Sequence, residues 1–384
     1  NGFANTVSSG EFTNCTITNA KVNNNGFAET IAGTYEKCKI TNALIGENGF
    51  AKNSTASLSE CGIFADASAF SDQETDRCYA KYYRPLDWNN NQKVIYNYTV
   101  IGTVIDNGKM RPQEEDVAGF ILNQSGQDIK NCYVTGCIYG SKNVYGFIKE
   151  YREWKKIDNC YVNAIINAGA NACGFIGNAV NSTISNCHAL GIISTKDAAS
   201  GFIGTITSSS IENCYEAFWK IDSNEWYPFY QNNNNPNYIQ LTSNYYLTDY
   251  LSSATGGSLV DYADKAKGLS YHQLASLKMD GLMDRADTTV GYYQYMPNDS
   301  EHQVYPYPMP SGMTAYGDWS YEDPDRYTLL YYEKVNGEYY FHGYVTEDGE
   351  NYNPVGTSGD NLENGLLAET DKTVMEDGYI LITG

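Results

Sequence analysis

The chain has 384 residues, of which 46 are acidic and 25 are basic, and its formal net charge is −21. This acidity argues against a protein that binds the phosphate backbone of nucleic acids, and it disfavours docking on anionic lipid. The hydrophobic fraction of 42% and the aromatic fraction of 14% are too high for a disordered chain. No apolar run is long enough to span a membrane. We therefore expect no direct membrane insertion, and the acidity leads us to expect no nucleic-acid partner.

The charge is distributed unevenly along the chain. Residues 1–220 carry 21 acidic and 18 basic side chains, whereas residues 221–384 carry 25 and 7. This asymmetry predicts a domain boundary near residues 220–250. The chain opens on Asn1-Gly2-Phe3 without a basic leader segment, so we expect it to be part of a longer protein.

A repeat organises the first two thirds of the chain. The phrase Ile-x-Asn-Cys recurs at spacings of 27 or 28 residues, and a Gly-Phe pair precedes each copy. Its cysteines are Cys132, Cys160, Cys187 and Cys214, and a shorter edition with 23-residue spacing contains Cys15, Cys38 and Cys61. We expect about nine coils within residues 1–250, counting Cys78 and two copies in which Tyr replaces Cys, at Asn97-Tyr98 and Asn244-Tyr245.

Each coil has the pattern of short strands joined by bends. Apolar or small residues alternate after the cysteine, which is typical of a strand. The isoleucine and the cysteine of the phrase are both apolar but lie three positions apart, so one straight strand cannot point both of them inward. The asparagine between them is expected to form a bend in the left-handed conformation, at Asn131, Asn159, Asn186 and Asn213. The repeats therefore predict an all-β, parallel β-solenoid whose core stacks like side chains.

The remainder of the chain predicts two smaller parts. Ser270 can cap a short helix that runs through Met279, and a Pro-rich arm follows it. Further on, a hairpin from Leu329 to Val345 around an Asn-Gly turn and a strand from Val374 to Thr383 indicate a small β-domain. The predicted domains are the β-helix at 1–250, the capping segment at 251–312 and the β-domain at 313–384.

Seven cysteines share one position of the repeat. We expect them to point inward as a column with a spacing of about 4.8 Å. A ladder of buried thiols is the preferred interpretation, because parallel stacked side chains give poor disulfide torsions. Some disulfides or a metal site are the alternatives, although the chain has no CxxC pair. Cys137 and Cys173 lie off the column and are predicted to be free thiols.

Two groups of aromatic residues are candidates for ligand binding. The position after the ladder cysteine is expected to face outward, and it holds Tyr133, Tyr161, His188 and Tyr215. Such a column could stack against sugar rings, or its rings could simply pack on one another along the sheet. The second candidate is Trp154, on a turn rich in cations, which could bind an anionic sugar or a protein partner, or else fold onto the solenoid.

Enzymatic activity is the main alternative, because many β-helices cleave polysaccharides. In the outward column Lys130, Asp158, Ser185, Glu212, the two acids would lie about 10 Å apart, at the edge of the separation used by inverting glycosidases. A lysine and a serine interrupt this column, so no catalytic residue is assigned. No metal ligand or cofactor is assigned either. Acidic turns at 322–325 and 347–350 could hold structural calcium, but they lack EF-hand spacing and are interpreted as solvated turns.

The Gly-Phe and Ile-x-Asn-Cys-Tyr-Val pattern resembles the GLUG repeat of bacterial surface proteins over about residues 1–250, with Phe where that family usually has Leu. The resemblance implies a right-handed β-helix at a cell surface, and it implies little about activity. Three later segments resemble the tail of large surface proteins from gut Firmicutes, some of which carry a prepilin-like leader. They are Gly268-Leu269-Ser270, Tyr305-Pro306-Tyr307-Pro308 and Tyr316-Gly317-Asp318-Trp319.

Together these features predict a non-catalytic extracellular protein of a Gram-positive gut bacterium, either secreted or attached to the cell surface. We expect an adhesin or a rigid stalk, with glycans or host surface proteins as partners. The alternative is a polysaccharide-degrading β-helix enzyme, either a lyase or a glycoside hydrolase.

Overall fold

The computed structural model describes most of residues 1–254 and several later segments. The described residues are 1–64 and 99–254, except 19, 42, 107–108, 235–237, 249 and 253, followed by 262, 265–269, 274, 313, 329–335, 338–346, 352–354, 372–374 and 380–382. Contacts divide the chain into two compact units, Asn1–Gly268 and Leu269–Gly384, and each is described by itself. Within the described residues, no helix has both the length and the apolar character needed to cross a membrane.

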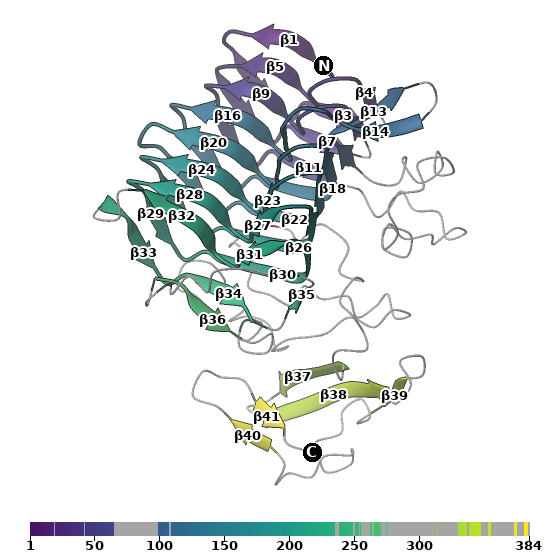
Figure 1. The fold of residues 1–384 in the computed structure, drawn as a ribbon, viewed down its shortest axis with the longest axis vertical. Coiled ribbons are helices and arrows are strands. Elements are labelled where there is room, and N and C mark those ends of the chain that lie inside the picture. Colours follow the sequence, from purple (N-terminus) through teal and green to yellow (C-terminus); the bar gives the residue numbers. More distant parts are fainter. Residues whose placement is uncertain are drawn as a thin grey trace. The chain divides into compact units, whose positions relative to one another are not determined.

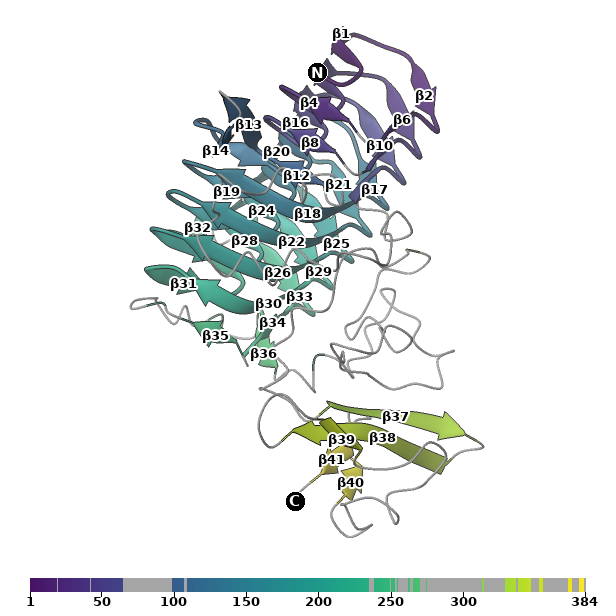
Figure 2. The same cartoon turned by 90° about the vertical axis from the view of Figure 1, so that its right-hand side faces the viewer.

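The first unit is a parallel β-solenoid, as the repeats predict, and its turns stack as rungs (Figures 1 and 2). Sheet A contains β1 (Ala4–Val7), β5 (Ala28–Ile31), β9 (Ala51–Ser54), β16 (Ile121–Ser125), β20 (Ile148–Arg152), β24 (Ile176–Val180), β28 (Ile203–Thr207) and β32 (Tyr230–Asn234). Sheet B contains β2 (Glu11–Thr13), β6 (Thr34–Glu36), β10 (Ser57–Ser59), β17 (Ile129–Lys130), β21 (Lys156–Asp158), β25 (Thr183–Ser185), β29 (Ser210–Glu212) and β33 (Gln240–Thr242).

Two further sheets complete the rungs. Sheet C contains β3 (Thr16–Thr18), β7 (Lys39–Thr41), β11 (Gly62–Phe64), β18 (Tyr133–Gly140), β22 (Tyr161–Ala168), β26 (His188–Thr195), β30 (Tyr215–Asp222), β34 (Tyr245–Leu247) and β36 (Lys267–Leu269), with β4 (Lys21–Val22), β8 (Leu44–Ile45), β12 (Val100–Ile101) and β35 (Leu251–Ser252) beside them. A narrow fourth sheet contains β15 (Val117–Ala118), β19 (Val144–Tyr145), β23 (Ala172–Cys173), β27 (Ala198–Ser200) and β31 (Glu225–Tyr227). A small antiparallel hairpin, β13 (Thr103–Asp106) and β14 (Lys109–Pro112), is inserted before β15.

The asparagine bends predicted from the repeat are confirmed. Each joins sheet B to sheet C in the left-handed conformation, with φ of 54°, 54°, 55° and 52° at Asn131, Asn159, Asn186 and Asn213. The bend lets the isoleucine before it and the cysteine after it both point into the core, where Ile129 and Cys132 are fully buried. Asparagine suits this position because its short polar side chain tolerates a positive φ.

The core consists of ladders of like side chains, again as predicted. A phenylalanine from each of seven successive rungs is fully buried, and neighbouring ring centroids lie 4.9–5.1 Å apart. These are Phe27, Phe50, Phe120, Phe147, Phe175, Phe202 and Phe229. The glycine before the phenylalanine allows close approach of the next rung, since a Cβ at Gly146 would lie 1.9 Å from the carbonyl oxygen of Gly174.

The expected number of coils is wrong between Cys61 and Cys132. Leu58 pairs directly with Ile129, and Gly62 pairs with Tyr133, so these two rungs are immediate neighbours. No further coil separates them, and Cys78 and Asn97-Tyr98 lie outside the described residues. The 23-residue and 27-residue repeats therefore join into one continuous solenoid, and residues 65–98, which connect β11 to β12 in the chain, lie outside the described residues.

The last rung also differs from its prediction. Tyr245 pairs with Tyr215, so Asn244, and not Tyr245, occupies the ladder position of the cysteine. The Asn244 side-chain oxygen accepts a hydrogen bond of 3.1 Å from the Cys214 amide, and its Nδ2 donates to the Ile211 carbonyl at 3.0 Å. Ser243 takes the bend position with a φ of 53°. An amide thus ends the thiol ladder.

The nine described cysteines are all free thiols, so the ladder interpretation is confirmed for the seven cysteines of the repeat, and Cys137 and Cys173 are free thiols as predicted. Amide hydrogen bonds to sulfur run along the column, from Cys132 N–H to Cys160 Sγ and from Cys160 N–H to Cys187 Sγ, both at 3.4 Å. Cys15 is the one described cysteine that is not fully buried, because it lies in the first rung.

We expect the native protein to shield this ladder from thiol reagents. Of the nine described cysteines, Cys15 should be alkylated quickly in native buffer, and the other eight only on unfolding. Peptide mapping of the labelled protein by mass spectrometry checks this site by site. Full labelling of Cys160 or Cys187 in the native state would contradict a closed core.

The second unit contains two sets of antiparallel strands. β37 (Leu329–Val335) and β38 (Glu338–Thr346) form the predicted hairpin, with Val335 opposite Glu338, and β39 (Tyr352–Pro354) joins β38. A single strand over 374–383 is wrong, because β40 (Lys372–Val374) and β41 (Ile380–Ile382) are two strands that pair antiparallel, and the residues between them lie outside the described part of the chain. The helix predicted to follow Ser270 lies outside the described residues, apart from Leu274.

Candidate ligand-binding corner

The predicted aromatic column is a continuous stack. The ring centroids of Tyr133, Tyr161, His188 and Tyr215 lie 5.4, 5.2 and 4.7 Å apart in succession, and their planes are within 11° of parallel. However, these four residues are at most 5% exposed, so the expectation that they face water is wrong. Alternation identifies the face of a strand on which a side chain lies, but it does not say whether that face is covered. The packing alternative is the one that this geometry supports.

His188 gives this stack a pH dependence. Burial lowers the pKa of its imidazole to about 3, whereas an unfolded histidine titrates near 6.5. The neutral ring therefore contributes its full stability above about pH 6.5, and this contribution is lost as the pH falls toward 3.

We expect His188→Tyr, which continues the column, to remove part of the acid sensitivity of the fold. Between pH 6.5 and 4.5 the wild type should lose about 2–3 kcal/mol more unfolding free energy than the variant. Urea denaturation at the two pH values measures this difference. Equal losses in both proteins would show that His188 is not a buried neutral imidazole.

Trp154 has the opposite environment. It is 74% exposed, so the alternative that it folds onto the solenoid is wrong. It lies on the corner between β20 of sheet A and β21 of sheet B, and both Glu153 (φ 86°) and Trp154 (φ 52°) adopt positive φ. A left-handed conformation costs a bulky residue about 1–3 kcal/mol, and an exposed ring recovers little of this by burial. Stability therefore does not explain a tryptophan at this position.

Neighbouring rungs hold the corner in place. The backbone N–H of Trp154 donates to the carbonyl of Asn181, and the carbonyl of Lys155 accepts from Thr183 N–H at 3.0 Å. On the other side, the Lys156 N–H donates to the Asp128 carboxylate at 2.8 Å. The indole is therefore presented from a backbone that is anchored to the rungs on both sides.

Charged residues of both signs flank Trp154 in the sequence, and several of them pair with one another. The guanidinium of Arg152 pairs with the carboxylate of Glu150, and the Lys156 ammonium lies 3.3 Å from Asp158. Glu153, the residue before Trp154, is exposed, and one of its carboxylate oxygens lies near Gly126 on the preceding rung. The corner thus combines a flat apolar surface with fixed hydrogen-bond donors and acceptors, the combination that recognises a polar molecule with an apolar face.

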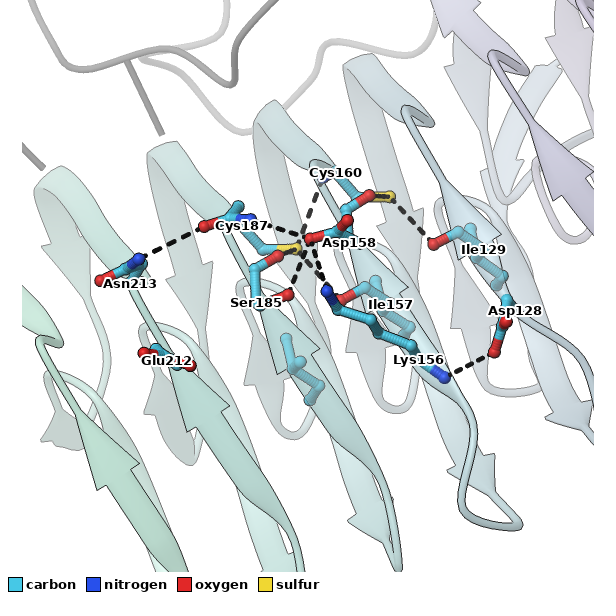
Figure 3. A network of polar contacts seen from close by, with 12 residues as sticks. Asp128, Ile129, Lys156, Ile157, Asp158, Cys160, Ser185, Cys187, Glu212 and Asn213 are labelled. Atoms are coloured by element: carbon cyan, nitrogen blue, oxygen red, sulfur yellow. Dashed lines mark hydrogen bonds and ion pairs between the residues drawn. The ribbon is translucent and has the colours of Figure 1, made fainter. Parts of the chain in front are cut away.

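The two acids considered for catalysis lie on sheet B, where Asp158 is part of a polar network (Figure 3). Its Oδ1 accepts from the Ser185 hydroxyl at 2.7 Å and from the Asn186 amide at 2.9 Å, besides the contact with Lys156. Glu212 is the register neighbour of Ser185 on the next rung. Asp158 thus serves as a hydrogen-bond acceptor between rungs, and acid–base chemistry would require it to give up these contacts.

A buried acid, Glu216, is not among the residues predicted from the sequence. Its register neighbour is Ala189, so its carboxylate lies inside the solenoid, fully buried. Its two oxygens accept hydrogen bonds from the Phe218 amide at 2.9 Å and the Leu247 amide at 3.0 Å, which ties the last rung to the one before. Aligning the repeats would have revealed it, because the equivalent residues are Val134, Val162 and Ala189.

Glu216 should make the last rung less stable as the pH rises above the ordinary pKa of a glutamate. Burial raises the pKa of this carboxyl well above its ordinary value. Its contribution is therefore present below the unfolded pKa of about 4.3 and is lost as the pH rises through the folded pKa. We expect Glu216→Gln to flatten the fall in unfolding free energy between pH 5 and 8, measured by urea denaturation. A slope identical to that of the wild type would contradict a buried carboxyl.

Among the described residues, no group of three or more His, Cys, Asp or Glu side chains is arranged to hold a metal ion. The acidic turns considered for calcium lie outside the described residues. Searches against family models, curated proteins and solved structures find no match to this chain.

Proposed function

We propose that this chain is a non-catalytic, extracellular protein of the GLUG-repeat type, a rigid stalk that acts as an adhesin through the corner at Trp154. The observation that carries the proposal is the exposed, conformationally strained tryptophan on a corner anchored to its neighbours. A positive φ recurs at this corner in the next two rungs, at Asn181 (49°) and Ser208 (46°), so the bend itself belongs to the repeat. A bulky exposed tryptophan in this bend is the exception, because selection for stability alone would favour a residue such as asparagine there.

The stalk role draws on the solenoid itself. Backbone hydrogen bonds link each rung to the next, and the stacked phenylalanines fill the interior continuously from Phe27 to Phe229. A repeat array of this kind resists bending, because each rung contacts its neighbours over its whole perimeter. It is suited to holding a ligand-contacting corner in a fixed orientation.

We propose a glycan as the ligand. The apolar face of a sugar ring packs on an indole, and the neighbouring guanidinium, ammonium and carboxylate groups hydrogen-bond to hydroxyls. Arg152, Glu153 and Lys156, which flank Trp154 in the sequence, would provide these groups. Because both signs of charge are present, the corner favours neutral or weakly charged sugars over strongly anionic ones.

The proposal is tested by applying purified wild-type protein and Trp154→Ala to an array of host and dietary glycans and to immobilised host matrix proteins. We expect glycan binding by the wild type that is lost in the variant. Phe3→Ala is the matched control, since Phe3 is also exposed (53%) but lies in the first rung. Binding to matrix proteins alone would replace the glycan by a protein partner. New reducing ends or unsaturated sugars released from polysaccharides would overturn the non-catalytic role in favour of an enzyme.

A further inference from the structure

We propose that the corner between sheets A and B is an elongated site for a linear oligosaccharide of at least four sugar units, with Trp154 and Tyr238 as its two aromatic platforms. This inference rests on the proposed glycan binding and adds a second contact residue, a minimum ligand length and a binding direction along the solenoid.

The first observation is that these two exposed aromatics share one corner. Tyr238 is 69% exposed and Trp154 is 74% exposed, and both lie between a strand of sheet A and the following strand of sheet B. The rungs of β24–β25 and β28–β29 lie between them, so the two residues are three rungs apart. At the spacing of hydrogen-bonded strands this separation is about 14 Å.

The second observation is the length of the corner in each rung. In each of the two intermediate rungs the corner consists of two residues, Asn181-Ser182 in one and Ser208-Ser209 in the other. They lie between the register pairs Val180–Thr207 and Thr183–Ser210. The rung of Trp154 has three residues at the corner, between Arg152 and Lys156. In the rung of Tyr238 the register positions Asn234 and Gln240 are also further apart in the sequence than in the intermediate rungs, and Tyr238 and Ile239 are the described residues between them. The repeat is thus lengthened at both rungs that present an exposed aromatic ring.

The third observation is the surface between the two rings. The intermediate corners carry small polar side chains, and Ser182 and Ser209 are buried with their hydroxyls donating to the carbonyls of Val180 and Thr207, both at 2.8 Å. Asn181 is partly exposed beside them. These two corners carry no bulky side chain to block a chain that runs from one ring to the other, and Asn181 offers its side-chain amide to sugar hydroxyls.

The geometry matches an extended saccharide. One sugar unit in an extended chain is about as long as the distance between rungs, so a unit stacked on Trp154 places the third unit after it over Tyr238. A ligand that reaches both rings gains from the second contact without a second loss of translational freedom. A shorter ligand reaches one ring at a time.

The test is a length series of the glycan that binds best on the array, from two to eight units, titrated by isothermal calorimetry. We expect the affinity to rise by at least about tenfold between two and four or five units and then to level off. Trp154→Ala and Tyr238→Ala should each abolish this rise, so that long ligands bind the variants no better than short ones. Phe3→Ala should keep it, and circular dichroism confirms that each variant is folded.

Two outcomes would overturn this inference in distinguishable ways. If Trp154→Ala weakens binding while Tyr238→Ala leaves the affinity for long ligands unchanged, the contact is confined to Trp154 and the proposed function stands without the elongated site. The same conclusion follows if affinity does not depend on length. If folded wild-type protein binds no glycan, the glycan-binding part of the proposed function fails together with this inference.

Discussion

Phe175→Ala should lower the unfolding free energy by about 3–5 kcal/mol, the range measured for truncating a buried phenylalanine. Phe175 is fully buried and stacks on Phe147 and Phe202, with ring centroids 4.9 Å away on either side. Removing the Phe175 ring opens a cavity in the middle of the ladder. The rungs on either side cannot collapse into this cavity, because hydrogen bonds hold them at a fixed spacing. Denaturation in guanidinium chloride measures the loss as a shift in midpoint.

Phe3 supplies the comparison from the same ladder. It stacks on Phe27 at 4.8 Å on one side, and it is 53% exposed because it belongs to the first rung. Phe3→Ala should therefore cost less than about 1 kcal/mol. Similar losses in the two variants would mean that the phenylalanines do not form one continuous buried ladder.

Gly146→Ala adds a single methyl group, yet we expect it to lower the unfolding free energy about as much as a large cavity in the core. The new Cβ would lie 1.9 Å from the Gly174 carbonyl oxygen and 2.8 Å from its carbon, both of which are backbone atoms of the next rung. Overpacking that side-chain rotation cannot relieve forces the rungs apart, and we expect a loss of about 3 kcal/mol or more. Thermal unfolding followed by circular dichroism provides the measurement.

Gly126→Ala is the control for the glycine substitution itself. Gly126 has a φ of 83°, and the nearest atom to an added Cβ is a Glu153 carboxylate oxygen at 3.2 Å, at the end of a flexible side chain. The alanine should cost about 1 kcal/mol through the left-handed backbone alone. If both variants lost the same stability, close packing of the Gly-Phe rungs would not be the reason for the glycine.

The regular part of the solenoid was predictable because its signals are local and repeated. The three-residue step from Ile129 to Cys132 requires a bend, and Asn131 is a residue that tolerates one, so strand, bend and core position follow from the spacing. The four copies with a 27- or 28-residue period therefore define the rung, and the shorter copies that contain Cys15, Cys38 and Cys61 join the same ladders.

The wrong predictions concern three features that the repeat pattern does not determine. These are the pairing of neighbouring rungs, the residue that can occupy a ladder position, and whether a face of a sheet is covered. Cys78 matches one letter of the repeat, but the direct pairing of Gly62 with Tyr133 excludes a coil between their rungs. Asn244 can take the place of a cysteine in the ladder because its small side chain accepts a hydrogen bond from the Cys214 amide. The residue type alone does not reveal that an asparagine fits this position. Tyr161 was placed on the correct face of its strand, yet the sequence contains no direct signal that this face is covered.

The candidate site was predictable only in part. Trp154 was a candidate because cations flank it in the sequence. Its exposure was not predictable, because it depends on the conformation of the corner, which a single sequence does not determine. Tyr238 could not be predicted as part of the site, because its position at the same corner as Trp154 becomes apparent only once the register of the rungs is known. Glu216 could have been found by aligning the repeats, since an acid replaces an apolar residue at one position.

The most direct test of this account is the equilibrium affinity of the wild type, Trp154→Ala and Phe3→Ala for the strongest ligand on the glycan array. The account predicts that Trp154→Ala binds at least about tenfold more weakly, while Phe3→Ala binds as the wild type does. Equal affinities of the wild type and Trp154→Ala would contradict it, because the exposed tryptophan would then make no contact with the ligand.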